Sequence, residues 1–405
     1  MNLNKKLLLL NLFFLQAYLV RFEIGGYPAN LQEILIGLQF LVFLYAIIKG
    51  KIFLETIFNI KHHWIILGFL GLTALSLATT EIINNINLIR HLKFLFFAAV
   101  LTFIFMETFR EKEEKENAIK IAGFGAIAFG IFSSIYNLLG FNVALDYRLL
   151  GPLDSAVYLS FYLTPFFLYF TIKFLENTKQ KSNLIFLVIL ALLLIATRSM
   201  GSILGSIVIL LIYMIKKTKL LKKTSLKIAA ALILLTVISI AFYTKILPTI
   251  KTDYSSLDER GEIWLVSTEL LKGPKTFLFG LGPSQFEQNY INTADKVLNH
   301  PPLDYYVIQP HNIFLLFIFN YGILGLIFLI FLIVKTISII IKPAEAKTNL
   351  HEIAGFVIAY FFLHGLIDTP FIKNDLLILL FIFLEISQKT KPKSFPGKNL
   401  DIPRK

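Results

Sequence analysis

The chain has 405 residues, of which 56% are hydrophobic and 16% charged, and its mean hydropathy is +0.71. This apolar content is higher than a soluble protein of the same length needs to form its core, so we predict an integral membrane protein. Its formal charge of +13 does not indicate nucleic-acid binding, because the Lys and Arg residues lie in short loops between apolar runs, where they orient a membrane protein. The absence of cysteine excludes disulfides, thiolate metal sites and a cysteine nucleophile.

The apolar runs predict membrane-spanning helices. Many approach or exceed the roughly 17 to 25 residues needed to cross a bilayer, and lipid offers no partner for backbone polar groups. Lys5 and Lys6 precede the first run, 7–20, and no small-residue cleavage site follows it. We therefore interpret it as a first span with an inner N-terminus rather than a removed signal. Further spans are predicted at 31–48, 63–80, 89–107, 119–139 and 155–172.

The next run, 183–215, is too long for one untilted helix. Lysines flank it on both sides, and if both flanks face the cytoplasm the chain must turn between them. The turn is predicted at Arg198-Ser199-Met200-Gly201, which places Arg198 at the outer surface. A span at 228–244, a long loop and spans at 313–334, 353–368 and 375–388 complete the prediction.

These runs predict an all-α fold: a polytopic integral membrane protein with about 12 transmembrane helices and a long extracytoplasmic loop between spans 9 and 10. Residues 1–388 form a single transmembrane domain, whose outer loop covers about 245–312, and 389–405 form a basic cytoplasmic tail. Both termini then face the cytoplasm, and most Lys and Arg residues fall on the inner side. The lysine cluster at 216–227 fits membrane orientation, with binding of anionic lipid as the alternative.

The outer side collects the polar residues that could carry chemistry. Arginine is informative there, because its planar donors suit phosphate oxygens. An ionisable group such as Arg198 is costly at a turn between apolar runs and is therefore a functional candidate, although an arginine snorkelling to headgroups would look the same. Arg260 follows Asp258 and Glu259 in a pattern typical of a helix start, and an ion pair with those acids is its alternative role.

Two histidines and an aspartate complete this outer set. His311 opens an apolar span with Asn312 beside it, and a neutral imidazole there could take a proton from a hydroxyl; the alternative is an interfacial histidine that caps a helix. His364 and Asp368 are four residues apart in one predicted span and are expected to share a face. They could orient a catalytic group or simply bond to each other.

Metal and nucleotide sites are not predicted. His62 and His63 are adjacent on the inner side, and no acidic pair faces them at ligand spacing, so we predict no metal and no other cofactor. The stretch Gly280-Leu281-Gly282-Pro283 lacks the strand, the third glycine and the lysine of a nucleotide-binding loop. We interpret it as a turn.

Several stretches together resemble the O-antigen ligase family, a superfamily that includes O-antigen polymerases and bacterial O-linked oligosaccharyltransferases. Their order and spacing cover more than half of the chain, with the long outer loop where the family has it. The matching stretches are Ala196-Thr-Arg198-Ser-Met-Gly201, Asp258-Glu-Arg260-Gly-Glu-Ile-Trp264, Phe279-Gly-Leu-Gly-Pro-Ser-Gln-Phe286, His311-Asn312 followed by Tyr321-Gly-Ile-Leu-Gly-Leu326, His364-Gly-Leu-Ile-Asp368-Thr-Pro-Phe371-Ile-Lys-Asn-Asp375 and, before the sixth span, Arg148-Leu-Leu-Gly151-Pro-Leu-Asp-Ser155.

The resemblance implies about twelve transmembrane helices and an extracytoplasmic site in the bacterial cytoplasmic membrane, with no metal and no nucleotide sugar. The implied donor is a glycan on undecaprenyl diphosphate, and the implied acceptor is a glycan or a glycolipid. Membrane lipids are the other expected partners. Arg198 and Arg260 match the family arginines that hold the diphosphate, and His311 matches the histidine to which activation of the acceptor is assigned. Arg148, Asn312, His364 and Asp368 are further candidates for substrate binding.

The expected function is therefore glycan transfer of the O-antigen ligase type. A polymerase of the same superfamily is the close alternative, because only the acceptor differs. A transporter or lipid flippase is the alternative from another class, but such folds often show two related halves, and here no halves repeat and the candidate residues gather on one side. Val157-Tyr158 stands where family members often have Asn-Tyr, which affects substrate contacts, and the compact outer loop argues against protein acceptors.

Overall fold

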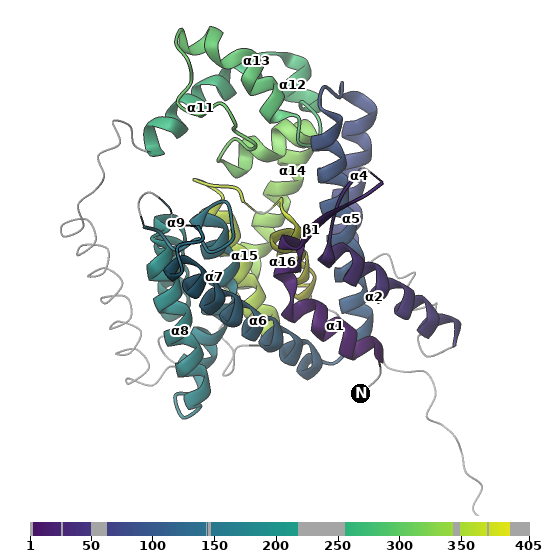
Figure 1. The fold of residues 1–405 in the computed structure, drawn as a ribbon, viewed down its shortest axis with the longest axis vertical. Helices are drawn as coiled ribbons and strands as arrows, with labels where there is room; N and C mark the ends of the chain where they lie inside the picture. Colours follow the sequence, from purple (N-terminus) through teal and green to yellow (C-terminus); the bar gives the residue numbers. More distant parts are fainter. Residues whose placement is uncertain are drawn as a thin grey trace, which may run out of the picture.

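The computed structural model describes residues 3–25, 27–49, 63–142, 144, 147–217, 256–342, 349–370 and 372–388. The regular elements in these ranges are helices and one two-stranded hairpin (Figure 1). The predicted span at 228–244 and the predicted tail at 389–405 lie outside the described residues.

Most predicted spans coincide with helices. Six of these helices, α2, α5, α6, α7, α9 and α14, are long and apolar enough to cross a membrane by length and composition. The structure thus supports a polytopic, mostly helical membrane protein, whereas the count of twelve spans stays a prediction. The helices are α2 (Leu31–Ile48), α4 (Trp64–Thr79), α5 (Asn85–Thr108), α6 (Lys112–Leu138), α7 (Ala156–Glu176), α8 (Lys181–Thr197), α9 (Met200–Lys217), α14 (Ile313–Ile341), α15 (Leu350–His364) and α16 (Asn374–Ile386).

The first apolar run differs from the continuous span that the sequence predicts. It forms α1 (Leu3–Phe13), about 16 Å long at 1.5 Å per residue, and a 3-10 helix, η1 (Leu15–Leu19). Within η1, Nε2 of Gln16 donates a hydrogen bond of 2.6 Å to the buried Asp375. The run thus serves polar contacts inside the bundle as well as apolar packing.

A short antiparallel hairpin follows η1. β1 (Arg21–Ile24) pairs with β2 (Tyr27–Asn30), with Arg21 opposite Asn30. The Gly25-Gly26 dipeptide between the strands is a common hairpin signal, although no strands were predicted from the sequence between the spans 7–20 and 31–48. Asn30 then caps α2, because its side chain accepts a hydrogen bond from the backbone N–H of Glu33.

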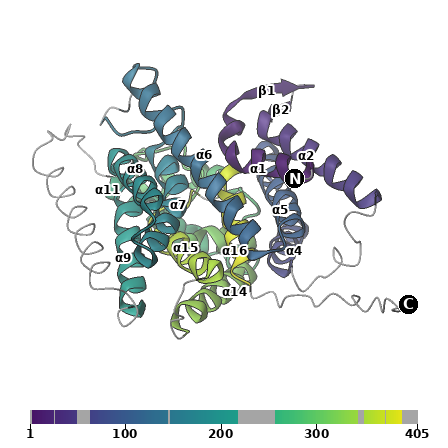
Figure 2. The same ribbon diagram turned by 90° about the horizontal axis from the view of Figure 1, so that it is seen from below.

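The turn predicted inside the run 183–215 is confirmed. α8 ends at Thr197 and α9 begins at Met200, and Arg198 between them has the left-handed φ of 52°. Figure 2 shows α15 and α16 in the middle of the bundle, with α7 on one side and α5 on the other. The turn at Arg198 therefore stands beside the central helix α15, which α9 contacts directly.

The stretch predicted as a long outer loop contains helices with a hydrophobic core of their own. They are α11 (Ser256–Leu271), α12 (Pro274–Phe279) and α13 (Phe286–Leu298), and they lie over one end of the bundle (Figure 1). Their core includes Ile263, Tyr290 and, from α14, Phe319, while Ile313 and Phe317 of α14 belong to the bundle core. The first part of α14 thus lies between two cores.

A backbone break in α14 accommodates the glycine-rich turn after α12. Gly322 has φ 64° and ψ −159° inside the helix, and the N–H groups of Leu281 and Gly282 donate to the carbonyl of Phe319 at 2.6 and 3.2 Å. A Cβ on Gly322 would lie 2.1 Å from the carbonyl oxygen of Leu278. Only glycine fits there, since φ is positive and the neighbouring backbone cannot move aside.

Replacing this glycine is expected to destabilise the protein. Gly322→Ala should lower the apparent Tm of the detergent-solubilised protein by about 5 °C or more, because a strained backbone and a clash with a carbonyl add together. Gly71→Ala is the matched control, since nothing lies within 4 Å of its Cβ position in α4 and alanine favours a helix. Equal Tm values for the two variants would contradict the packing described for Gly322.

Candidate active site

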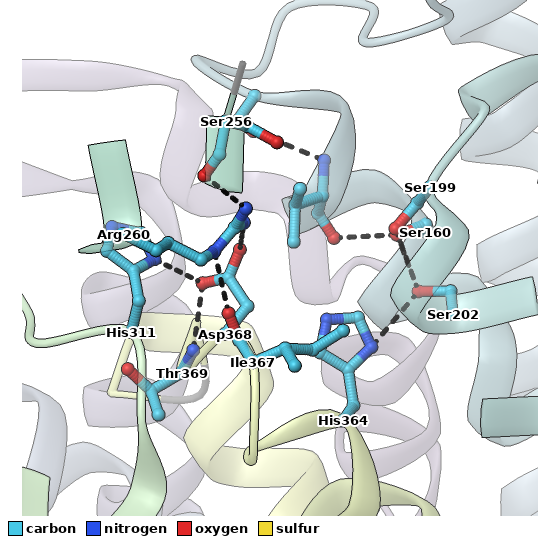
Figure 3. A network of polar contacts seen from close by, with 12 residues as sticks. Ser160, Ser199, Ser202, Ser256, Arg260, His311, His364, Ile367, Asp368 and Thr369 are labelled. Atoms are coloured by element: carbon cyan, nitrogen blue, oxygen red, sulfur yellow. Dashed lines mark hydrogen bonds and ion pairs between the residues drawn. The ribbon is translucent and has the colours of Figure 1, made fainter. Parts of the chain in front are cut away.

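The carboxylate of Asp368 is the centre of a polar site at the end of the bundle that carries α11 to α13 (Figure 3). Its Oδ1 lies 3.0 Å from Nδ1 of His311, and its Oδ2 lies 3.4 Å from Nη2 of Arg260. Oδ1 also accepts a 2.8 Å hydrogen bond from the backbone N–H of Thr369. One acidic side chain therefore joins Arg260 and His311, two of the three residues that the sequence predicted to carry chemistry.

Arg260 is held by backbone carbonyls as well as by this carboxylate. α11 begins at Ser256 with Asp258 and Glu259 in its first turn, which confirms the predicted helix start. From the second turn, Nε of Arg260 donates to the carbonyl of Ile367 and Nη1 to that of Ser256, both at 2.9 Å. The side chain is 20% exposed. The guanidinium is thus fixed in orientation while part of it still faces solvent.

His311 occupies a strained position just before α14. Its φ is 50°, a value that costs a non-glycine residue free energy, and its side chain is 30% exposed. Next to it, Oδ1 of Asn312 accepts from the backbone N–H groups of Phe314 and Leu315. Asn312 is the N-cap of α14. The alternative role predicted for His311, capping this helix, is therefore filled by its neighbour.

Contacts on both sides hold this segment in place. Nδ2 of Asn312 donates to the carbonyl of Leu366 at 3.1 Å, and the N–H of Ile313 donates to the carbonyl of Gly365 at 2.6 Å. On the other side, Nε1 of Trp264 in α11 donates to the carbonyl of Pro310 at 3.1 Å. Asn312, a candidate for substrate binding, is therefore engaged in fixing the backbone around His311.

Asp368 is charged because of its neighbours. Burial raises the pKa of its carboxyl, but the hydrogen bond and charge of His311, together with the charges of His364 and Arg260, outweigh burial and hold the pKa below its ordinary value. A carboxylate at Nδ1 of His311 keeps the proton on that nitrogen and leaves the lone pair on Nε2. The imidazole is thereby prepared to accept a proton at Nε2.

His364 and Asp368 do not lie in one helix as predicted. α15 ends at His364, and Asp368 lies in the turn that follows, where its N–H donates to the carbonyl of His364 at 3.0 Å. His364 is 2% exposed, and its Nδ1 lies 3.1 Å from the hydroxyl of Tyr360 and 3.4 Å from Oγ of Ser202. The two side chains have different hydrogen-bond partners (Figure 3).

The other two candidate arginines are Arg198 and Arg148. The segment of Arg198 packs against the loop of Asp368, and the segment of Arg148 packs against the end of α8. The turn after Arg198 contacts the loop of Asp368, since a Cβ on Gly201 would lie 3.0 Å from Ile367 and 3.1 Å from the ring of His364. The N–H of Leu149 donates to the carbonyl of Ala196 at 2.9 Å, which ties the segment of Arg148 to the end of α8. Both arginine side chains are partly exposed.

The structure also reveals polar groups that the sequence reading missed. Ser202 connects the hydroxyls of Ser160, at 2.7 Å, and Tyr360, at 3.0 Å, beside His364. Further away, the buried His91 bridges Oγ of Ser284 and the hydroxyl of Tyr321 at 2.9 and 3.0 Å. Polar residues inside apolar spans were the available signal. Among the residues that the structure describes, no group of His, Asp and Glu could hold a metal ion.

Comparison with known proteins agrees with the family resemblance. Residues 185–330 match the family model described as O-Antigen ligase. The match contains the turn of Arg198, the start of α11, the glycine-rich turn, His311 and the break in α14. No curated protein matches the chain.

The charge on Asp368 should be visible in the pH dependence of stability. A carboxyl whose pKa is lowered by folding stabilises the protein above its unfolded pKa of about 3.9, and this contribution is lost as the pH falls through the folded pKa. Asp368→Asn should therefore lower the Tm at pH 7, with a deficit that shrinks below about pH 4.

Thermal unfolding in detergent between pH 3 and 7 checks this expectation. Asp304→Asn is the matched control, because Asp304 is an exposed loop aspartate that accepts a hydrogen bond from the N–H of Tyr306. It should change the Tm little at any pH. A deficit for Asp368→Asn that stays constant from pH 7 to pH 3 would contradict the assigned charge.

Proposed function

We propose that this chain, whose residues 185–330 match the O-antigen ligase family model, is a membrane glycosyltransferase that moves a glycan from undecaprenyl diphosphate to an acceptor hydroxyl. The transfer takes place at the outer face of the bacterial cytoplasmic membrane, without a metal ion, and both termini are cytoplasmic. The observation that supports this proposal best is the shared carboxylate of Asp368, which holds a base, His311, next to a fixed cation, Arg260.

His311 acts as the general base in this proposal. Nε2 takes the proton of the acceptor hydroxyl while the hydroxyl oxygen attacks the anomeric carbon of the donor sugar. The positive charge that forms on the imidazole is balanced by Asp368 at 3.0 Å, an arrangement that stabilises an imidazolium. The exposed fraction of the ring, 30%, gives the acceptor access.

The arginines act on the leaving group. As the bond between the anomeric carbon and the phosphate oxygen breaks, negative charge grows on undecaprenyl diphosphate, and fixed cations stabilise it. Arg260 suits this role because its hydrogen bonds to Ile367, Ser256 and Asp368 use only part of its N–H donors. Arg198 would supply the second cation from its turn. Direct displacement by the hydroxyl inverts the configuration at the anomeric carbon.

The arrangement of the site favours this chemistry over transport. A transporter commonly binds its substrate near the middle of the membrane between related halves. Here Arg260, His311 and Asp368 meet where α11 begins, α14 begins and α15 has ended. A site at the ends of helices suits substrates whose reacting groups lie at the membrane surface.

Alanine variants test the roles of these residues. His311→Ala should lower the transfer rate by about 10²–10⁴, the usual contribution of a general base, and Arg260→Lys should lower it less than Arg260→Ala, because lysine keeps the charge but loses the planar fork. The assay follows transfer from a synthetic undecaprenyl diphosphate glycan by purified protein in nanodiscs. His300→Ala is the control, since His300 is 53% exposed and lies 3.7 Å from Glu262. Normal transfer by a well-folded His311→Ala protein would reject the mechanism.

The product of the same assay separates the ligase from the polymerase. A ligase should attach one donor glycan to an acceptor that carries no undecaprenyl diphosphate, giving a single mass increase. Mass spectrometry of the product checks this expectation. A ladder of lipid-linked products of increasing length, formed from donor alone, would assign polymerase activity instead.

A further inference from the structure

The helix α12 presents an apolar surface that its own hydrophobic core does not cover. None of its residues is buried, and Phe277, Leu278 and Phe279 are 41%, 48% and 43% exposed. Lys272, on the preceding turn, is 72% exposed, and Lys275 is exposed as well. We call the surface formed by Phe277, Leu278, Phe279 and Lys275 the α12 surface.

The α12 surface lies where two neighbouring helices of the bundle meet their connecting loop. A Cβ on Gly282, just after α12, would lie 2.8 Å from Oγ1 of Thr80, the C-cap residue directly after α4. Gln285 accepts hydrogen bonds from the N–H groups of Ile83 and Asn84, directly before α5. The end of α12 is therefore fixed at the level where α4 ends and α5 begins.

At this level α12 also meets α14, the helix that carries an exposed apolar stripe. α12 packs against α14 at its break, where a Cβ on Gly280 would lie 2.6 Å from the carbonyl of Phe319. Beyond the break, α14 exposes large apolar residues at helical spacing on a candidate membrane span, as expected for a face that contacts lipid. They are Leu324, Ile327, Ile330, Phe331, Val334, Ile337 and Ile341, between 44% and 74% exposed.

We propose that the α12 surface is a membrane-interface anchor, with Phe277, Leu278 and Phe279 among the acyl chains and Lys275 at the lipid phosphates. The occupant is the bilayer leaflet on the side of α11 to α13. Contact with α14, whose exposed apolar stripe is expected to face lipid, supports this choice, and aromatic residues next to lysines match the apolar and anionic layers of an interface. The proposal concerns only membrane contact and holds whatever reaction the site performs.

The anchor has a structural consequence for the candidate active site. In the turn directly after α12, the N–H of Leu281 donates a hydrogen bond to the carbonyl of Phe319 in α14. His311 lies just before the same helix. A fixed depth of α12 therefore sets the height of His311 relative to the bilayer surface. A site that acts on a lipid-borne group benefits from such a fixed height.

Single-cysteine spin labelling tests the anchor, because the chain has no native cysteine. Leu278→Cys is labelled in full-length protein in nanodiscs of phosphatidylcholine with phosphatidylglycerol, and power saturation measures its accessibility to oxygen and to a water-soluble nickel chelate. We expect oxygen to exceed the chelate, as for Ile327→Cys on α14. Lys296→Cys, exposed on α13, should show the reverse order.

Two outcomes would overturn the proposal. A label at Leu278 that is as accessible to the nickel chelate as the label at Lys296 would place the α12 surface in water. Spectral broadening at Leu278 that disappears on dilution with unlabelled protein would assign the surface to a second copy of the chain. Phe277→Cys, labelled in the same way, provides an independent reading if Leu278→Cys fails to fold.

Discussion

The candidate site depends on one buried negative charge. Oδ1 of Asp368 contacts His311 and Oδ2 contacts Arg260. The side chain of Asp368 is only 13% exposed. A carboxylate in that position is costly without partners, so the three segments that meet there stabilise one another electrostatically. Asp368 is separated in sequence from His311 by 57 positions and from Arg260 by 108, and its charge gives the three segments a common contact.

The first part of α14 is the mechanical link between site and bundle. Residues 313–321 contribute to both hydrophobic cores, so neither core can shift without moving His311. The helix is kinked at Gly322. The backbone N–H groups of Leu281 and Gly282 donate to the carbonyl of Phe319 beside this kink. The two glycine-containing motifs at 279–286 and 321–326 are thus two sides of one contact.

Local patterns were sufficient for much of this fold. Apolar runs located most helices, lysines on both flanks of 183–215 located the turn at Arg198, and Asp258 and Glu259 marked the start of α11. The pairing of Asp368 with His311 was not predicted, because it depends on tertiary contacts between distant segments. Sequence spacing instead suggested a pair of His364 and Asp368, whereas Nδ1 of His364 lies 3.1 Å from the hydroxyl of Tyr360. Likewise, the run 7–20 was predicted as one span, because the hydrogen bond between Gln16 and Asp375 is a tertiary contact that local sequence does not indicate.

The unequal distances around Asp368 suggest how one carboxylate can serve two cations with different tasks. Its contact with His311 is short, at 3.0 Å, whereas its contact with Arg260 is 3.4 Å and lies near the limit of a hydrogen bond. Arg260 is instead positioned by two carbonyls at 2.9 Å, which orient the guanidinium without neutralising it. Its charge therefore remains available to an incoming anion, while the charge of Asp368 is directed mainly at His311. This division fits a site in which the base must become positive as the leaving group becomes negative.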